Sequence, residues 1–266
     1  MEQNIIETHN LTKKFGDFVA VDGINLSVER GKVFAFLGPN GAGKTTTIRM
    51  LTTLLDPTQG EIIINGLNSK HEKANIRKSF GIVFQDPSLD NELTAYENLD
   101  FHGVMYDVPK KARRERIEIL LKFVGLQDRR NEFVKNFSGG MKRRLEIARG
   151  LIHHPKILFL DEPTIGLDPQ TRNHLWEYIK KANKEEGMTV FLTTHYMEEA
   201  ENMADIIAVI DLGKIVALGT SEELKKQTKA SSLEKAFLEL TGKQIREEAG
   251  TARDRAKNQG RMWGHR

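Results

Sequence analysis

A glycine-rich stretch ending in Lys-Thr carries the strongest chemical signal in the sequence. It fits the pattern G-x-x-x-x-G-K-[ST] of a phosphate-binding loop, in which backbone N–H groups surround phosphate oxygens. The loop comprises Gly38, Pro39, Asn40, Gly41, Ala42, Gly43, Lys44, Thr45 and Thr46. The lysine of such a loop reaches the β- and γ-phosphates, and the hydroxyl that follows it binds Mg²⁺. We therefore expect Lys44 to be the fixed cation and Thr45 a metal ligand.

Two adjacent acids follow an apolar stretch later in the chain. Residues 157–160 are typical of a buried parallel strand, and Asp161 and Glu162 come directly after them. Carboxylates in that position are costly unless they face a cleft, a metal or a cation. With a phosphate loop upstream, Asp161 fits a magnesium ligand and Glu162 fits the base for an attacking water. A pair of surface acids in a loop is the alternative.

Three single residues are weaker candidates. Gln85 follows the apolar stretch 81–84, and the carboxyl ends of strands are where α/β sheets bind ligands. His195 comes just after the apolar stretch 189–194. Phe15 lies in a polar turn, where an aromatic ring can stack on a base. Taken alone, Gln85 is better explained as a loop amide, His195 as a structural histidine, and Phe15 as an aromatic side chain packed against the core.

A small-residue motif opens the helix expected over 138–152. Ser138 is a good N-cap, and Gly139 and Gly140 leave bare N–H groups at the helix N-terminus, which favours an anion. A plain capped helix is the alternative if the motif stands alone.

The surrounding pattern indicates the elements that carry these residues. Alternating and apolar runs predict strands, and longer runs with apolar residues at helical spacing predict helices. Residues 5–37 are rich in β-strand signals, and Asn65-Gly66 indicates a hairpin. Ser221 is expected to begin a helix with Ser-x-x-Leu in place of a full capping box. Further strands are expected at 61–65, 81–84, 189–194, 206–210 and 214–217, and helices at 46–55, 92–125, 138–152, 170–182, 221–226 and 233–240.

Composition narrows the classes of protein that fit. The chain has 266 residues, 39% of them hydrophobic, which suits one large domain or two modest ones. Its 40 basic and 37 acidic residues nearly balance, so charge gives no case for nucleic acid. The absence of cysteine excludes disulfides and thiolate chemistry. No signal peptide and no apolar run long enough to span a bilayer is recognised, so a membrane role is expected only through a partner.

The order of these signals resembles that in the ATP-binding subunits of ABC transporters, over roughly residues 3–220. The Ser-Gly-Gly motif between the phosphate loop and the paired acids is the discriminating part. The resemblance implies that Phe15 stacks on adenine, that Gln85 touches Mg²⁺ and links the site to a membrane partner, and that Glu162 is the catalytic glutamate. It also implies that His195 contacts the γ-phosphate. Ser138, Gly139 and Gly140 would grip the γ-phosphate of ATP held by a second subunit, and Asp168 would lie at the dimer seam.

The resemblance also implies a fold and a division of the chain. The expected fold is α/β, a P-loop NTPase core with a mixed sheet, an N-terminal antiparallel β subdomain and a helical insertion. Residues 1–220 would form the ATP-binding domain, with the insertion at about 88–150. Residues 221–242 would add a helical extension, and the polar residues 243–266 are expected to form a disordered tail.

Function and partners follow from the same resemblance. We expect a subunit that binds ATP and Mg²⁺, hydrolyses ATP as a homodimer, and drives a separate transmembrane permease from the cytoplasmic face of the membrane. Phe137 and Met141 replace the commonest signature residues, and with Lys142-Arg143-Arg144 and residues 232–242 they resemble the drug- and antibiotic-export branch. A soluble ABC ATPase without a permease, and one acting on DNA or ribosomes, are the alternatives.

Overall fold

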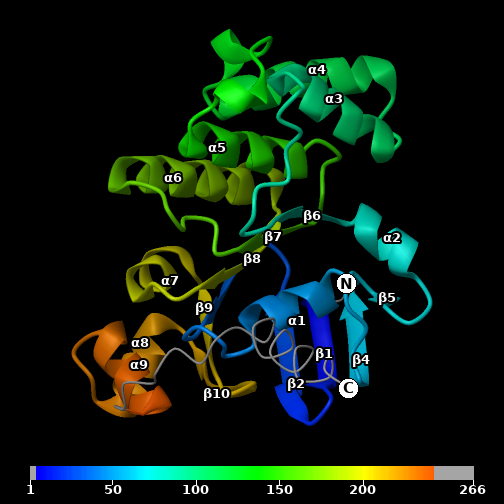
Figure 1. Cartoon of the computed structure of the whole chain (residues 1–266). Coiled ribbons are helices and arrows are strands. Elements are labelled where there is room, and N and C mark those ends of the chain that lie inside the picture. Colours follow the sequence, from blue (N-terminus) through cyan, green and yellow to red (C-terminus); the bar gives the residue numbers. More distant parts are fainter. Residues whose placement is uncertain (1–3, 243–266) are drawn as a thin grey trace, which may run out of the picture.

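The computed structural model describes residues 4–242, which form two sheets and the helices around them (Figure 1). The strands are β1 (Asn4–Phe15), β2 (Phe18–Glu29), β3 (Val33–Leu37), β4 (Gln59–Ile64), β5 (Leu67–Asn68), β6 (Phe80–Val83), β7 (Ile157–Asp161), β8 (Thr189–Thr194), β9 (Ile206–Asp211) and β10 (Lys214–Gly219). The α-helices are α1 (Lys44–Leu51), α2 (Lys73–Lys78), α3 (Ala95–Met105), α4 (Lys110–Phe123), α5 (Gly139–Gly150), α6 (Pro169–Glu186), α7 (Met197–Met203), α8 (Ser221–Thr228) and α9 (Leu233–Thr241). Two short 3₁₀ helices are η1 (Gln127–Arg129) and η2 (Val134–Asn136).

The larger sheet has six strands in the order β10-β9-β3-β8-β7-β6. Strands β9, β3, β8, β7 and β6 pair in parallel, and β10 adds an antiparallel edge, so the sheet is mixed as expected. Every residue of β3, β7 and β8 is buried, because both faces of this sheet are covered. The fold class predicted from the sequence is confirmed.

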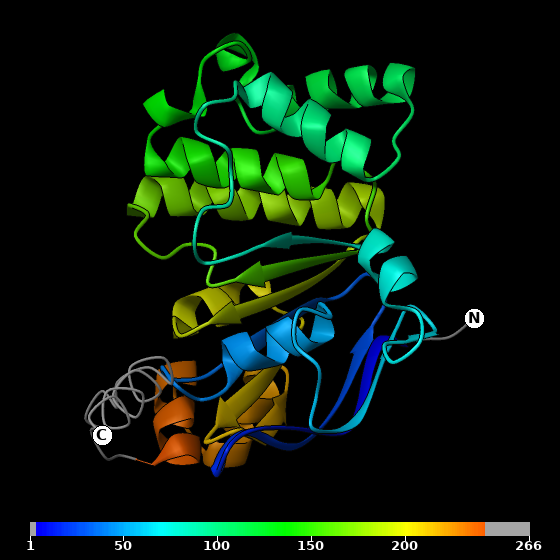
Figure 2. The same ribbon diagram turned by 45° about the vertical axis from the view of Figure 1, so that its right-hand side comes forward.

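A smaller antiparallel sheet covers one face of the larger one. Its order is β2-β1-β4-β5, and helix α1 lies between the two sheets in both views (Figures 1 and 2). Phe34 of β3 and Phe191 of β8 stack with ring centroids 5.3 Å apart in the core that fills this space. Alternate residues of β3, such as Ala35, face the other core. The strand before the phosphate loop is therefore held from both sides.

Helices α5 and α6 run side by side over the opposite face, and α3 and α4 form a further layer outside them (Figure 2). Helix α5 approaches the sheet closely, since a Cβ atom at Gly81 in β6 would collide with the backbone of Gly150. The region expected as a helical insertion contains α3, α4 and α5. The proposed domain limits stay a prediction.

Three local predictions needed correction. The helix expected over 92–125 is two helices, α3 and α4, and the chain between them includes Asp107 with a φ of 58°. The helix after the phosphate loop ends at Leu51 rather than at residue 55, because the backbone of Thr53 turns to a left-handed φ of 59°, which an α-helix does not contain. Helix α8 does have a full capping box, but its N-cap is Thr220, one residue earlier than expected, with Glu223 as the reciprocal partner.

Two expectations concern the membrane and the tail. Among residues 4–242, no helix combines the length and apolarity that crossing a bilayer requires. The tail expected at 243–266 lies outside the described residues.

Candidate active site

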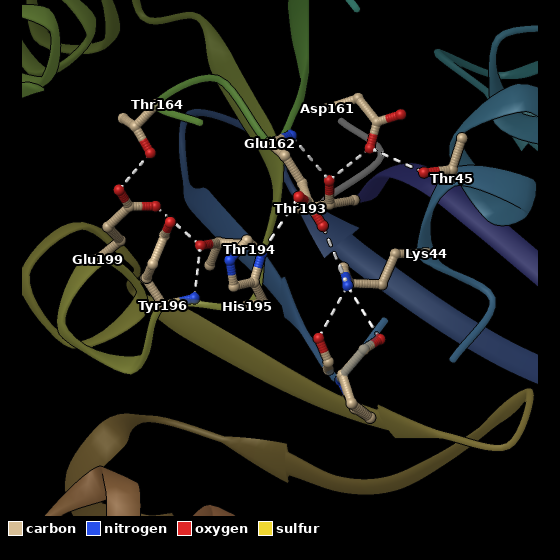
Figure 3. Close-up of polar contacts among 12 residues, drawn as sticks. Lys44, Thr45, Asp161, Glu162, Thr164, Thr193, Thr194, His195, Tyr196 and Glu199 are labelled. Carbon is tan, nitrogen blue, oxygen red and sulfur yellow. Dashed lines mark hydrogen bonds and ion pairs between the residues drawn. The ribbon is translucent and has the colours of Figure 1, made fainter. Parts of the chain in front are cut away.

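The carboxyl ends of four parallel strands bring most of the candidate residues to one edge of the sheet. Strand β3 leads into the phosphate loop, β8 ends just before His195, β7 ends at Asp161, and β6 ends two residues before Gln85. Because neighbouring parallel strands end at the same edge, residues separated by more than 100 positions in the chain meet there (Figure 3).

The phosphate loop holds its lysine inward. Helix α1 begins at Lys44 directly after Gly43, whose φ of 106° and close approach to the carbonyl of Ala20 leave no room for a side chain. Lys44 is only 5% exposed, and its Nζ donates to the carbonyls of Gly38 at 2.8 Å and Pro39 at 3.1 Å. The same ammonium lies 3.1 Å from Glu162 Oε1. The loop thus folds around its own cation.

Glu162 sits between the Lys44 ammonium and the His195 ring. Lys44 approaches its Oε1, and Nδ1 of His195 lies 3.1 Å from its Oε2, so both carboxylate oxygens are engaged (Figure 3). The backbone of Glu162 has a φ of 47°, which is rare for a residue with a side chain and stores strain. Its N–H donates to Thr193 Oγ1 at 3.1 Å. This side chain is directed by its backbone as well as by its contacts with Lys44 and His195.

Asp161 lies beside the first residues of α1. Its Oδ1 accepts from Thr193 Oγ1 at 2.6 Å and from Thr45 Oγ1 at 3.3 Å. Burial raises the pKa of Asp161 above its usual value, and the two threonine hydrogen bonds oppose that effect. A divalent cation here would offset the cost of the buried charge.

The oxygen donors of Thr45 and Asp161 fit a magnesium ion that is shared with a phosphate ligand better than a metal ion whose ligands all come from the protein. Thr45 and Asp161 present oxygen atoms, which Mg²⁺ prefers, and it usually takes one or two carboxylates together with phosphate oxygens. Among the described residues no group of three or more His, Asp or Glu side chains could hold a metal. The site therefore suits a cation that arrives with a phosphate ligand.

Two expected residues stand apart from this cluster. Gln85 is exposed at the end of β6 and has no side-chain hydrogen bond in the described structure. Phe15 ends β1, is 46% exposed, and carries the Lys13 ammonium 5.3 Å from its ring centroid. The ring is thus available at the surface and is not packed into the core.

The two expected dimer motifs are exposed helix N-caps. Ser138 accepts from the N–H of Met141 at 3.3 Å at the start of α5, and Gly139 and Gly140 form the first residues of that helix. Asp168 caps α6 and accepts from both the N–H and the hydroxyl of Thr171, which lowers the pKa of Asp168. Both motifs are therefore ordered by contacts within their own helices.

Sequence reasoning missed a buried acid that joins two of the site loops. Glu199 of α7 is 4% exposed and accepts from Thr194 Oγ1 at 2.8 Å and from Thr164 Oγ1 (Figure 3). Thr164 is two residues beyond Glu162, and Thr194 precedes His195. Glu199 looks like an ordinary helix acid in the sequence, so no local signal identifies this link.

Comparison with known proteins gives consistent matches. The family model described as "ABC transporter" matches residues 21–165. The linearmycin resistance ATP-binding protein LnrL of Bacillus subtilis is 44% identical over 220 residues, which cover 83% of this chain and 70% of the relative. The daunorubicin/doxorubicin resistance ATP-binding protein DrrA of Streptomyces peucetius is 44% identical over 244 residues, which cover 92% and 73% of the two chains.

Solved structures agree with this match. The ATP-binding subunit of an ABC transporter superposes with a TM-score of 0.82 at 30% identity, over 90% of this chain and all of that one. A dimeric ATP-binding cassette in a post-hydrolysis state, bound to ADP and phosphate, superposes with a TM-score of 0.73 at 30% identity, over 81% of this chain and 98% of that one.

Proposed function

Because the chain belongs to the ABC transporter family as an ATP-binding protein, we propose that it powers export of a hydrophobic, drug-like compound through a separate permease. Members of this family hydrolyse ATP to drive transport, and this chain is one of them. The observation that carries the proposal is the contact of Lys44 and His195 with the two oxygens of Glu162 at the carboxyl edge of the sheet. The export step rests on relatives named for resistance to linearmycin and daunorubicin.

The arriving phosphates would redistribute the contacts of this cluster. Lys44 would turn from the carbonyls of Gly38 and Pro39 to the β- and γ-phosphates, and His195 would contact the γ-phosphate. Glu162 would then be released from Lys44, and its free oxygen could orient water and accept a proton from it. Catalysis by these residues is positioning plus neutralisation of charge.

Thr45 and Asp161 are the proposed ligands of Mg²⁺, with Gln85 completing the site. When bound, the ion supplies positive charge that offsets the charge of the β- and γ-phosphates. Phe15 would stack on adenine, with little selectivity between bases because stacking reads no base edge.

A second copy of this chain would complete each ATP site. Ser138, Gly139, Gly140 and Asp168 are proposed to face the nucleotide bound by that copy. The exposure of Ser138 and Asp168 supports this arrangement, because their hydrogen bonds within the chain are confined to their own helices. The bare N–H groups at the start of α5 suit the anionic γ-phosphate.

An apolar stripe on α3 supports docking to a membrane partner. Phe101, Val104 and Met105 are 62%, 51% and 64% exposed, and their spacing puts them on one face of the helix. Exposed apolar side chains grouped in this way mark interaction surfaces. The proposed location is the cytoplasmic face of the membrane, with attachment through the permease alone.

The catalytic assignment is tested with one substitution, Glu162→Gln, followed by measurements of turnover and of dimer formation. Glu162→Gln keeps the shape of the side chain but removes the base, so ATP should still bind while turnover falls by about 100-fold or more. With Mg-ATP the variant should elute as a stable dimer on size-exclusion chromatography. Lys44→Ala is the control that should lose ATP binding itself. A Glu162→Gln variant with normal turnover would refute the catalytic assignment.

The permease is tested separately. The chain should co-purify from detergent-solubilised membranes with a polytopic membrane protein. Full recovery in the soluble fraction of cells that express the neighbouring genes would favour the ABC ATPase without a permease.

A further inference from the structure

One arginine of α5 contacts two other segments of the chain and an acid of its own helix. Arg143 is 6% exposed, and its Nε donates to the carbonyl of Pro163 at 2.6 Å while Nη2 donates to the carbonyl of Glu162 at 3.2 Å. Its Nη1 donates to the carbonyl of Phe84 and to Glu146 Oε2, the latter at 3.0 Å. The guanidinium therefore joins α5 to the segments that follow β7 and β6.

The contact with Glu162 acts on a strained residue. Glu162 has a φ of 47°, and the peptide on its N-terminal side is held by Thr193, which accepts its N–H. Arg143 holds the peptide on the C-terminal side, through the carbonyl of Glu162. A left-handed backbone persists only when its surroundings fix it, so these two anchors set where the side chain leaves the backbone, and the contacts with Lys44 and His195 then hold the carboxylate.

The other contacts tie down the segment that contains Gln85. Phe84 precedes Gln85 directly, and its carbonyl is bound by Arg143. Three residues after Gln85, the N–H of Ser88 donates to Glu146 Oε1 at 2.8 Å, and the Ser88 carbonyl accepts from Arg149 at 2.6 Å. Both ends of this segment are thus attached to α5, the helix that begins at Ser138.

We propose that Arg143 is a positioning residue for Glu162, which fixes the direction of that carboxylate relative to the segment around Gln85 and to the start of α5. The inference rests on the catalytic role of Glu162 proposed above. A guanidinium suits this role because its planar fork can serve several acceptors in fixed directions, whereas a lysine ammonium offers three donors from one point. Movement of α5 relative to the core would be transmitted to Glu162 through this side chain.

The experiment compares Arg143→Lys with Arg116→Lys in the full-length chain. Arg116 is the matched control because it is also buried and also binds a backbone carbonyl, that of Leu151, and a carboxylate, that of Glu186, but neither belongs to a site loop. For Arg143→Lys we expect kcat to fall by about 10-fold to about 100-fold, as misplacement of a catalytic group does. Its KM for ATP and its affinity for a fluorescent ATP analogue should stay within about twofold of wild type.

Thermal unfolding separates positioning from stability. Both variants should lower Tm, but Arg116→Lys should keep wild-type kcat. Equal kcat in Arg143→Lys and wild type, or equal losses of kcat in the two variants, would overturn the proposal.

A second variant keeps the inference testable if Arg143→Lys does not fold. Glu146→Gln keeps only one of the two acceptor oxygens that serve Arg143 and Ser88 and removes the charge, but leaves the contacts of Arg143 with the backbone carbonyls, so it should lower kcat by a smaller factor. Wild-type kcat in that variant would count against the proposal. Failure of the proposed function is recognised separately, because wild type itself would then show no ATPase activity that depends on Glu162.

Discussion

Removal of the buried acid Glu199 should weaken both the fold and the active site. In Glu199→Ala the hydroxyls of Thr164 and Thr194 lose their common acceptor. Both threonines are 1% exposed, so water cannot replace the lost carboxylate without movement of the loops. The loops concerned are those that carry Glu162 and His195.

The magnitude follows from the two hydroxyls. A buried donor left without an acceptor costs about 1–3 kcal/mol, so two of them cost about 2–6 kcal/mol. Rotation of the hydroxyls toward other acceptors favours the lower half of that range, about 3 kcal/mol. Arg172, whose Nε lies 3.6 Å from Glu199 and whose side chain is 26% exposed, adds little. In a protein of this size the loss corresponds to a Tm lower by about 6–12 °C.

Circular dichroism during heating, without nucleotide, measures this change. Glu199→Gln retains an acceptor oxygen and should lose less than half as much. Glu198→Ala removes the exposed neighbouring acid in the same helix and should change stability by no more than about 0.5 kcal/mol. If the Tm of Glu199→Ala equals that of wild type, or is no lower than that of Glu198→Ala, the hydrogen bonds of Glu199 with Thr164 and Thr194 contribute nothing to stability.

Two further changes can be predicted. Burial is the main cause that lowers the pKa of His102 to about 3 and that of His153 to about 4. Nearby Arg149 lowers the pKa of His102 further, and nearby His154 and Arg116 lower that of His153. Below about pH 6.5 the unfolded chain therefore binds more protons than the folded one, and the free energy of unfolding from urea titrations should fall as the pH falls to about 5, less steeply in His153→Asn. Phe101→Asp should reduce the permease recovered with the protein and leave the ATPase activity of the isolated subunit unchanged. Leu218→Asp, at another exposed apolar site, on β10, should leave the recovery of the permease unchanged, and equal recovery with both variants would contradict docking at α3.

The sequence predicted those parts of the site that local patterns encode. The strand before Gly38, the glycine loop and the strand that ends at Asp161 have signatures within ten residues, and the structure brings them to one edge of the sheet. The roles of these residues stay predictions. The alternative that Phe15 packs against the core is wrong, because almost half of its surface is exposed.

Contacts between distant segments had no such signature. Glu199 is separated from Thr164 by 35 positions and Arg143 from Phe84 by 59, and each contact depends on the packing of a helix against a sheet edge. The ion pair of Lys44 with Glu162 likewise requires the parallel order of β3, β8 and β7. Residue type alone cannot distinguish such a buried Glu or Arg from the solvated ones that surround it in sequence.

The close approach of Gly81 to Gly150 holds that end of α5 against β6, so any rotation of the helix would turn about this contact. The helix has 12 residues, so Ser138 lies about 18 Å from the contact, at 1.5 Å per residue. A rotation of about 10° would move the Ser138 end by about 3 Å and the backbone at Arg143 by about 2 Å, while Glu146 and Arg149, which hold Ser88, would move less. In such a rotation the part of α5 that holds the segment next to Gln85 would move little, and the Ser-Gly-Gly motif at the other end of the helix would move most. A small displacement applied from outside at Ser88 would be magnified where a facing nucleotide would bind.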